Sequence, residues 1–173
     1  MISADLENLR DFFIKEGYPS EIQEATEINQ KQVITYVGKA LDTYDLILRT
    51  SHIQPAIEEG SKEIPLKFLQ FYLLLPFEVK ESCLFETMRF ICSINASFDL
   101  ASFGLLEAGH LLYYRHVMMV SKNTLDEESL RAFLGSFEVL VYSFFGPLEA
   151  IATGKKSKEE LEKEVKEILH STP

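Results

Sequence analysis

The sequence predicts a small α+β protein in which helices pack on an antiparallel sheet of about five strands. Three observations carry this prediction. Residues 33–75 are rich in β-branched and aromatic residues, which favours strands. Residues 98–120 have the pattern of a hairpin. Residues 125–151 have a single apolar stripe at helical spacing, which predicts a long helix. The expected order of elements is α-βββ-α-ββ-α, followed by a charged C-terminal helix.

Length and composition favour one domain. The chain has 173 residues, of which 46% are hydrophobic and 25% are charged. A chain of this length buries about 70% of its unfolded surface in one core. We expect residues 1–154 to form a single α+β domain and residues 155–173 to form a charged helical tail, which a capping-box pattern at Ser157–Glu160 begins.

The first element is an amphipathic helix that starts near Ser3 or Asp5 and ends at Gly17-Tyr18-Pro19. Its apolar side repeats at helical spacing and consists of Ile2, Leu6, Leu9 and Phe13. Residues 20–31 are polar and show no period, so we predict no element there.

Three strands follow, at residues 33–37, 43–50 and 66–75. The second alternates apolar and polar residues, which is typical of a half-buried strand. The third is nearly continuous in apolar residues and should be a central strand that Pro76 stops, because proline lacks a ladder donor. Residues 52–65 contain prolines, a glycine and several charges, which predicts an exposed loop.

The second half begins with a helix at residues 82–95. A tight reversal at Glu107–His110 then joins two strands, and Gly109 supplies the positive φ that the turn needs. Thr124–Glu127 matches a capping box ahead of the long helix. Pro147 should kink or restart that helix, since it removes a backbone hydrogen bond.

The negative net charge of the chain argues against two classes of partner. The net charge is −10 and the pI is about 4.9. Nucleic-acid binding needs a basic stripe, and anionic lipid repels an acidic surface, so we expect neither nucleic acid nor membrane as a partner. The first residues lack the pattern of a signal peptide, and no apolar run approaches the roughly 20 residues of a bilayer span. We therefore expect a cytoplasmic protein.

Candidate catalytic residues do not converge, which predicts that the protein is not an enzyme. Glu107, His110, Tyr113 and Arg115 surround the hairpin, and an acid, a base and an oxyanion group are conceivable there. The alternative, which we favour, is that these residues are polar because turns and strand edges face water. We expect no cofactor and no metal, because no Cys or His pair has ligand spacing and no nucleotide or hydrolase motif is present.

Strand parity divides the sheet into two faces. If the long helix packs on one face, that face holds Tyr44, Leu46, Leu48, Phe71, Leu73, Leu112, Tyr114 and Met118. The opposite face then holds Ile47, Arg49, Phe68, Tyr72, Leu74, Tyr113 and Arg115. This mixture of tyrosine, apolar groups and arginine is typical of a protein-binding surface, so these seven residues are our predicted partner site. The alternative is that the first helix or the tail helix covers this face within the same molecule.

The chain resembles the YbjN-like proteins and the type III secretion chaperones. The resemblance lies in residues 88–98, in residues 103–115, in the acidic start of the long helix and in the aromatic-Gly-Pro-Leu segment at Phe144–Leu148. It covers about residues 3–152. It implies a small, acidic, non-enzymatic, cytoplasmic protein that forms a homodimer and holds a client protein or peptide segment on a sheet face or strand edge. The alternative that it leaves open is a regulatory adaptor of the YbjN type, which binds a folded partner or a small effector.

Overall fold

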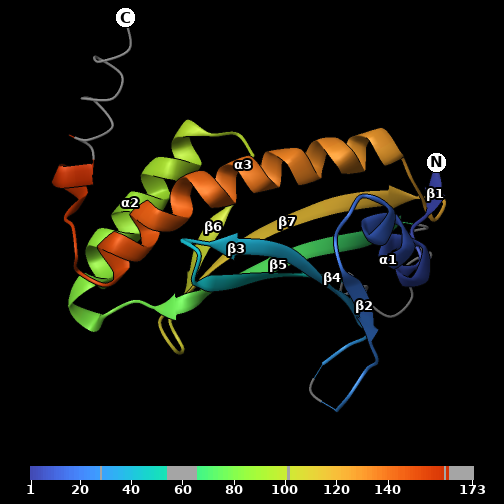
Figure 1. Ribbon diagram of the computed structural model, residues 1–173, viewed down its shortest axis with the longest axis horizontal. Helices are drawn as coiled ribbons and strands as arrows, with labels where there is room; N and C mark the ends of the chain where they lie inside the picture. Colours follow the sequence, from blue (N-terminus) through green and yellow to red (C-terminus); the bar gives the residue numbers. More distant parts are fainter. Residues whose placement is uncertain (28, 54–65, 101, 162, 164–173) are drawn as a thin grey trace, which may run out of the picture.

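The computed structural model describes residues 1–27, 29–53, 66–100, 102–161 and 163 (Figure 1). It confirms the α+β class: helices pack on one antiparallel sheet. The elements in chain order are β1 (Ile2–Ser3), α1 (Leu6–Lys15), β2 (Ser20–Gln23), β3 (Gln32–Ala40), β4 (Tyr44–Ile53), β5 (Leu66–Glu78), the 3-10 turn η1 (Glu81–Cys83), α2 (Leu84–Ser97), β6 (Phe103–Leu106), β7 (Leu111–Ser121), β8 (Thr124–Leu125) and α3 (Glu127–Ala152).

The sheet has eight strands where we expected about five. Its order is β1-β8-β7-β5-β4-β3-β2, and β6 also pairs with β7. The expected five are β3, β4, β5, β6 and β7. The other three are short: β1 and β8 have two residues each, and β2 has four polar-rich residues that gave no visible period.

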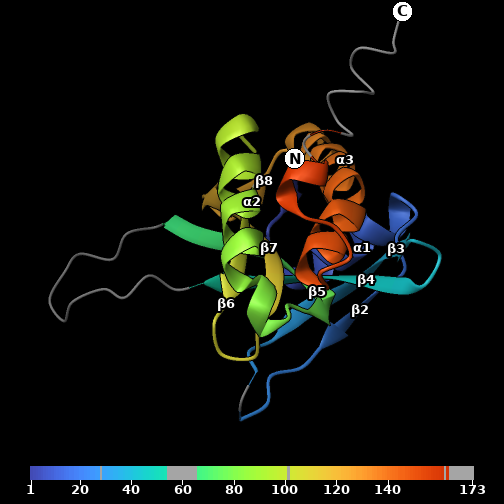
Figure 2. The same cartoon turned by 90° about the vertical axis from the view of Figure 1, so that its left-hand side faces the viewer.

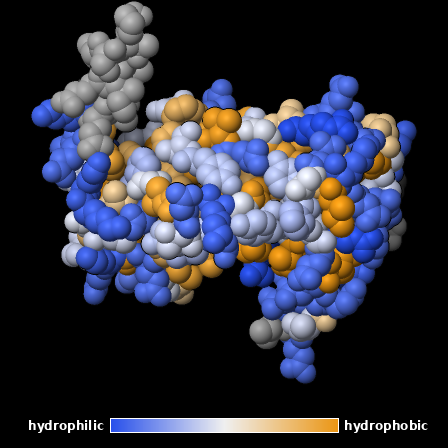
Figure 3. All heavy atoms as spheres, in the orientation of Figure 1, coloured by the Kyte–Doolittle hydropathy of each residue, from blue (hydrophilic) through white to orange (hydrophobic). Residues whose placement is uncertain are grey.

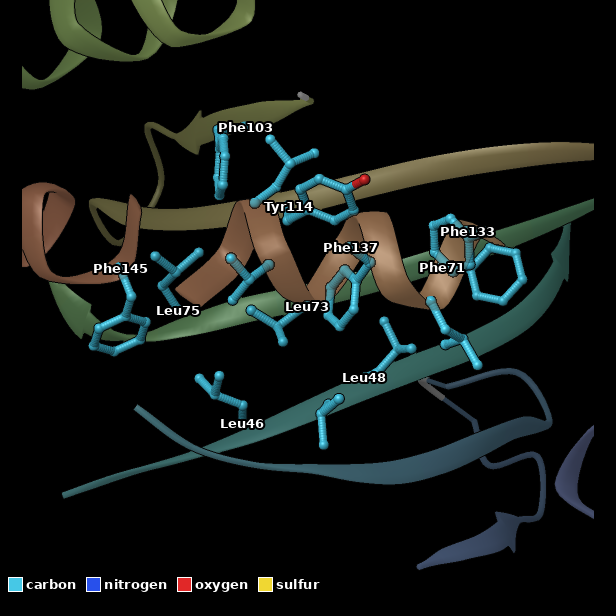
Figure 4. Close-up of a cluster of buried hydrophobic side chains, with 14 of the residues drawn as sticks. Leu46, Leu48, Phe71, Leu73, Leu75, Phe103, Tyr114, Phe133, Phe137 and Phe145 are labelled. Carbon is cyan, nitrogen blue, oxygen red and sulfur yellow. The ribbon is translucent and has the colours of Figure 1, made fainter. Parts of the chain in front are cut away.

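The core lies between the sheet and the helices. α3 points its phenylalanines at the sheet, and the Phe133 ring packs against Phe71 of β5 with centroids 4.3 Å apart and the ring planes tilted by 41° (Figure 4). Phe137 meets Tyr114 of β7 at 5.3 Å. By length and composition alone α3 is also able to cross a membrane, but its apolar stripe is the side buried on this sheet.

The helix α1 joins the same core. Its buried residues Leu9 and Phe13 belong to one cluster with Leu48 and Phe71, and Arg131 of α3 forms an ion pair with Glu16 at 2.9 Å. α2 lies beside α3, as Figures 1 and 2 both show. All three α-helices therefore contribute to one core.

The predicted strand end at Pro76 and the predicted restart of the helix at Pro147 need correction. β5 continues through Pro76 to Glu78, and the register with β7 shifts between Leu74 and Glu78, so a bulge accommodates the missing donor. α3 runs without a restart through Pro147. Its N-cap is Asp126, which accepts a hydrogen bond from the Ser129 amide, so the cap lies two residues after the predicted Thr124.

Of the other predicted turns and boundaries, some are confirmed and some are shifted. Gly109 has the expected positive φ at the β6–β7 turn, and Gly154 has one just after α3. His52 and Ile53 lie inside β4, so the first two residues of the predicted loop are strand; residues 54–65 are outside the described residues. The capping box of the tail is present, since the Ser157 amide donates to Glu160 at 2.7 Å. The expected tail helix beyond 163 lies outside the described residues.

Candidate functional site

The seven predicted partner-site residues lie together on the face of the sheet that is turned away from α3. We call this the reverse face. The alternate residues of the same strands point to the other face, and Leu48, Leu73 and Tyr114 among them are buried in the core. Arg49 and Arg115 are exposed, and the other five side chains are half-buried: Ile47, Phe68, Tyr72, Leu74 and Tyr113.

A charged and aromatic row crosses the middle of the reverse face. Arg49 of β4 pairs in register with Tyr72 of β5, and Tyr72 pairs with Arg115 of β7. Adjacent strands are about 4.8 Å apart, so the two arginines are separated by about 10 Å with a phenol between them. Neither guanidinium forms an ion pair with any residue that the structure describes.

Tyr72 is electrostatically coupled to this row. Burial raises the pKa of its phenol, and the neighbouring Tyr113 acts in the same direction, while Arg115 and Arg49 act to lower it. A tyrosine phenol is protonated at neutral pH with or without this shift. Its hydroxyl is therefore a hydrogen-bond donor placed between two cations.

Tyr72 and Tyr113 stack on one another, with ring centroids 5.3 Å apart and an interplanar angle of 24°. Tyr113 pairs across the ladder with Gly104 of β6, and a Cβ at Gly104 would overlap the Tyr113 ring. The absence of a side chain at Gly104 thus lets the ring lie flat over β6. The two tyrosines form a continuous aromatic platform.

Apolar side chains extend the face on both sides of the row. Ile53, Phe68 and Met119 continue it toward one end of the strands, and Met119 is 64% exposed. Strand parity identifies Met119 and Val117 with the same signal that gave Tyr113 and Arg115, but the prediction stopped at Arg115. Ile34 and Tyr36 of β3 are further members, because they pair with Arg49 and Ile47.

A pocket of about 490 Å³ opens where the β2–β3 loop meets the reverse face. Arg49, Ser51, Gln70 and Tyr72 come from the sheet, and the loop contributes mainly polar residues. The loop stands out from the body as a largely hydrophilic projection (Figure 3). Sequence reasoning missed this pocket, because residues 20–31 carried no pattern that would place them against β4 and β5.

Within the described part of the chain, neither helix that was considered as a cover lies on the reverse face. α1 packs into the core on the opposite side of the sheet, so the prediction that the first helix might cover the reverse face is wrong. The beginning of the tail buries Leu161, which is 6% exposed, and Figure 2 places this turn beside α2 and α3. The remainder of the tail is not described.

The groups considered for catalysis do not meet at one place. Glu107 is exposed and His110 is half-buried in the β6–β7 turn, whereas Tyr113 and Arg115 lie on the reverse face. The next histidine, His116, lies on the core face, stacked on Phe133 at 4.8 Å. Among the described residues there is no group of three or more His, Cys, Asp or Glu side chains arranged to hold a metal ion. Cys83 and Cys92 are both free thiols.

Comparisons with known proteins support the fold alone. No protein-family model matches the chain, and no curated protein matches it. The crystal structure of YbjN from E. coli, a candidate transcription regulator, superposes with a TM-score of 0.51 at 15% sequence identity. The match covers 87% of this chain and 94% of that chain. The chain therefore has a YbjN-like fold.

Proposed function

We propose that the protein is a non-enzymatic binding module that holds an extended, acidic and apolar segment of a client protein on its reverse face. The observation that supports this most is the in-register row of Arg49, Tyr72 and Arg115. In a chain with a net charge of −10, two arginines without an ion pair among the described residues form a local site for carboxylates.

The geometry suggests how a client would lie. Alternate side chains of an extended chain share a face, so two residues four positions apart, about 13 Å, both face the sheet, and the long side chains of Arg49 and Arg115, whose strands are about 10 Å apart across β5, can splay to reach them. A client with two acidic residues at this spacing is able to contact both guanidiniums. An apolar or aromatic residue between them would then rest on the Tyr72–Tyr113 platform.

Apolar contact should supply most of the affinity. Exposed ion pairs contribute only about 0.2–1 kcal/mol each, whereas burying apolar area contributes about 25 cal/mol per Å². Phe68, Leu74 and Met119 offer such area beside the row. The arginines would mainly select for acidic clients and fix their register.

A regulatory adaptor that binds a small effector is the second candidate, because the pocket of about 490 Å³ is lined by Arg49, Ser51, Gln70 and Tyr72. Arg49 and Tyr72 supply hydrogen-bond donors, Ser51 and Gln70 can donate or accept, and the loop adds the Glu27 carboxylate, so the lining suits a small polar effector that carries both donors and acceptors. Similarity to a candidate transcription regulator is compatible with either role. A cytoplasmic homodimer without cofactor, nucleic acid or membrane remains part of the proposal.

The deciding experiment is a pull-down from the native cells, with mass spectrometry to identify the client, followed by affinity measurements on variants. Tyr72→Asp together with Tyr113→Asp should abolish client binding and leave the melting temperature within a few degrees. Val139→Asp is the matched control, since Val139 is an exposed apolar residue on α3 and is 67% exposed. Global unfolding of the double variant would show that the tyrosines are structural. Co-purification of a folded regulator would favour the adaptor.

A further inference from the structure

The outer edge of β7 has a gap in its pairing. β5 runs along one side of β7, whereas the other side is shared by two short strands. Along β7, β6 pairs only with Leu111–Tyr114, and β8, which also pairs with β1, meets β7 only at Ser121. Between them, residues 116–120 have no strand partner on that side within the described chain. We call these five residues the β7 notch.

The direction of the backbone groups in the notch follows from the hydrogen bonds at its ends. The Arg115 amide donates outward to the Ser102 carbonyl at 3.0 Å, and the Ser121–Thr124 pair closes the other end. Because alternate residues of a strand point their N–H and C=O groups to the same side, Val117 and Met119 also point theirs outward. No described residue bonds to these outward groups.

The notch is also apolar. Its sequence is His-Val-Met-Met-Val, without a charged residue, although exposed strand edges are usually protected by charges, prolines or bulges. Val117 is 40% exposed and Met119 is 64% exposed on the reverse face. An edge of this kind is stable in water only if it is short or has a partner.

A pocket of about 220 Å³ lies next to the notch on the core side. Tyr114, His116 and Met118 form its β7 wall, and Ser129, Phe133 and Ser136 are on the α3 side. It exceeds the size of cavities that hold benzene. In a strand added to β7, the residues beside His116 and Met118 would point to this side, and the residue beside Val117 would point to the reverse face.

From this geometry we infer that the β7 notch is a strand-addition site for a short segment of another polypeptide. The occupant is an extended stretch of about five residues, because five residues at about 3.4 Å each span the distance between β6 and β8. It carries an apolar side chain that enters the pocket, while main-chain bonds form with Val117 and Met119.

A second copy of this chain does not fit the notch through its own β7. That strand has 11 residues and is flanked by its own β6 and β8 on the side that would have to enter. In the receiving molecule, β6 and β8 bound the notch at its two ends, so a strand of 11 residues is too long to lie between them. A free, extended segment has neither obstacle. The inference does not depend on the arginine row, because it uses different backbone and pocket groups.

The test begins with a phage-displayed library of random dodecamers selected on the full-length protein. A selected peptide should slow amide hydrogen exchange at Val117 and Met119 and leave the amides of His116 and Met118, which face β5, unchanged. Val117→Pro removes one outward donor at an edge position, where proline is tolerated, and should weaken peptide binding by tenfold or more. Val117→Thr retains the amide and the β-branched shape, so it should bind within about threefold of wild type.

Met119→Pro is the second variant if Val117→Pro does not fold, and the exchange measurement on the wild-type protein needs no variant. The inference is overturned if the library yields no binder, if both amides exchange as fast as before, or if Val117→Pro and Val117→Thr bind alike. If a peptide is lost on Tyr72→Asp but not on Val117→Pro, the proposed function stands and the strand-addition site does not.

Discussion

Tyr113 lies across Gly104, its partner on the neighbouring strand, and the ring occupies the space that a side chain at position 104 would need. The same ring stacks on Tyr72. The glycine therefore has a role in the reverse face although it contributes no side chain to it. It sets the height of the aromatic platform above the sheet.

Gly104→Ala should weaken client binding and lower the free energy of unfolding by no more than about 1.5 kcal/mol. The added methyl group would push away the outer part of the Tyr113 ring, which is the flexible end of that side chain. Displacement of the ring breaks the stack with Tyr72, and such stacks contribute about 0.5–1.5 kcal/mol. We expect three- to tenfold weaker binding, together with loss of the nuclear Overhauser effects between the two rings.

Gly135→Ala is the matched control for that substitution. Gly135 lies inside α3, and a Cβ there meets no atom within 4 Å. Alanine should raise the free energy of unfolding by about 0.5–1 kcal/mol through helix propensity and leave binding unchanged. If Gly104→Ala and Gly135→Ala affect binding equally, the platform is not what the client contacts.

The sequence identified five of the strands, the three α-helices and the division into two faces, because these show a periodicity of 2 or 3.6 residues or a long apolar run. The division depends on parity alone, which is why all seven predicted residues fall on one face. Shorter elements gave too few residues for a period, as β1 and β8 show. Pro76 was misjudged because a bulge offset the missing donor.

The remaining parts of the site depend on contacts between distant segments, which no local pattern encodes. The pocket at Arg49 exists because the β2–β3 loop returns over β4 and β5. The β7 notch exists because β6 begins only at Phe103, opposite Tyr114, while β8 already ends at Leu125 after pairing with Ser121. Both features depend on where strands stop relative to their neighbours, and strand ends are the part of a fold that propensity determines least.

Lys155→Met should destabilise the protein through Glu149. Glu149 is 5% exposed, and the Lys155 ammonium lies 2.5 Å from its carboxylate. Removing the cation leaves a buried charge without its ion pair, which costs more than the pair itself contributes. We expect the melting temperature to fall by several degrees, measured by thermal denaturation at pH 7.

The double variant Glu149→Gln, Lys155→Met separates that explanation from a general effect of the tail. Without the carboxylate, loss of the lysine should matter little, so the double variant should melt above Lys155→Met alone. Equal melting temperatures of these two variants would contradict the account. The comparison is a double-mutant cycle, and it needs both single variants.

Acidification should destabilise the protein partly through His116. Burial against Phe133 lowers the pKa of His116 below its ordinary value of 6.5. The neutral imidazole is therefore favoured in the folded state, so its contribution is complete above about pH 6.5 and is lost as the pH falls below that value. His52 has a lowered pKa for the same main reason, burial. His116→Phe should accordingly flatten part of the decline in melting temperature between pH 7.5 and 5.5; an unchanged decline would exclude His116.

Reversal of both arginine charges provides the sharpest test of client selection on the reverse face. Arg49→Glu with Arg115→Glu places two carboxylates beside Tyr72 and should repel an acidic client, because exposed pairs of about 0.2–1 kcal/mol each change to repulsion. We expect binding to weaken about three- to thirtyfold at 50 mM salt, and the difference from wild type to shrink at 500 mM, where the Debye length is only a few ångströms. Replacing the client's acidic residues with lysine should restore binding to the reversed protein and weaken it to wild type. If the salt dependence is the same for both proteins, apolar contact alone holds the client and the arginines do not select it.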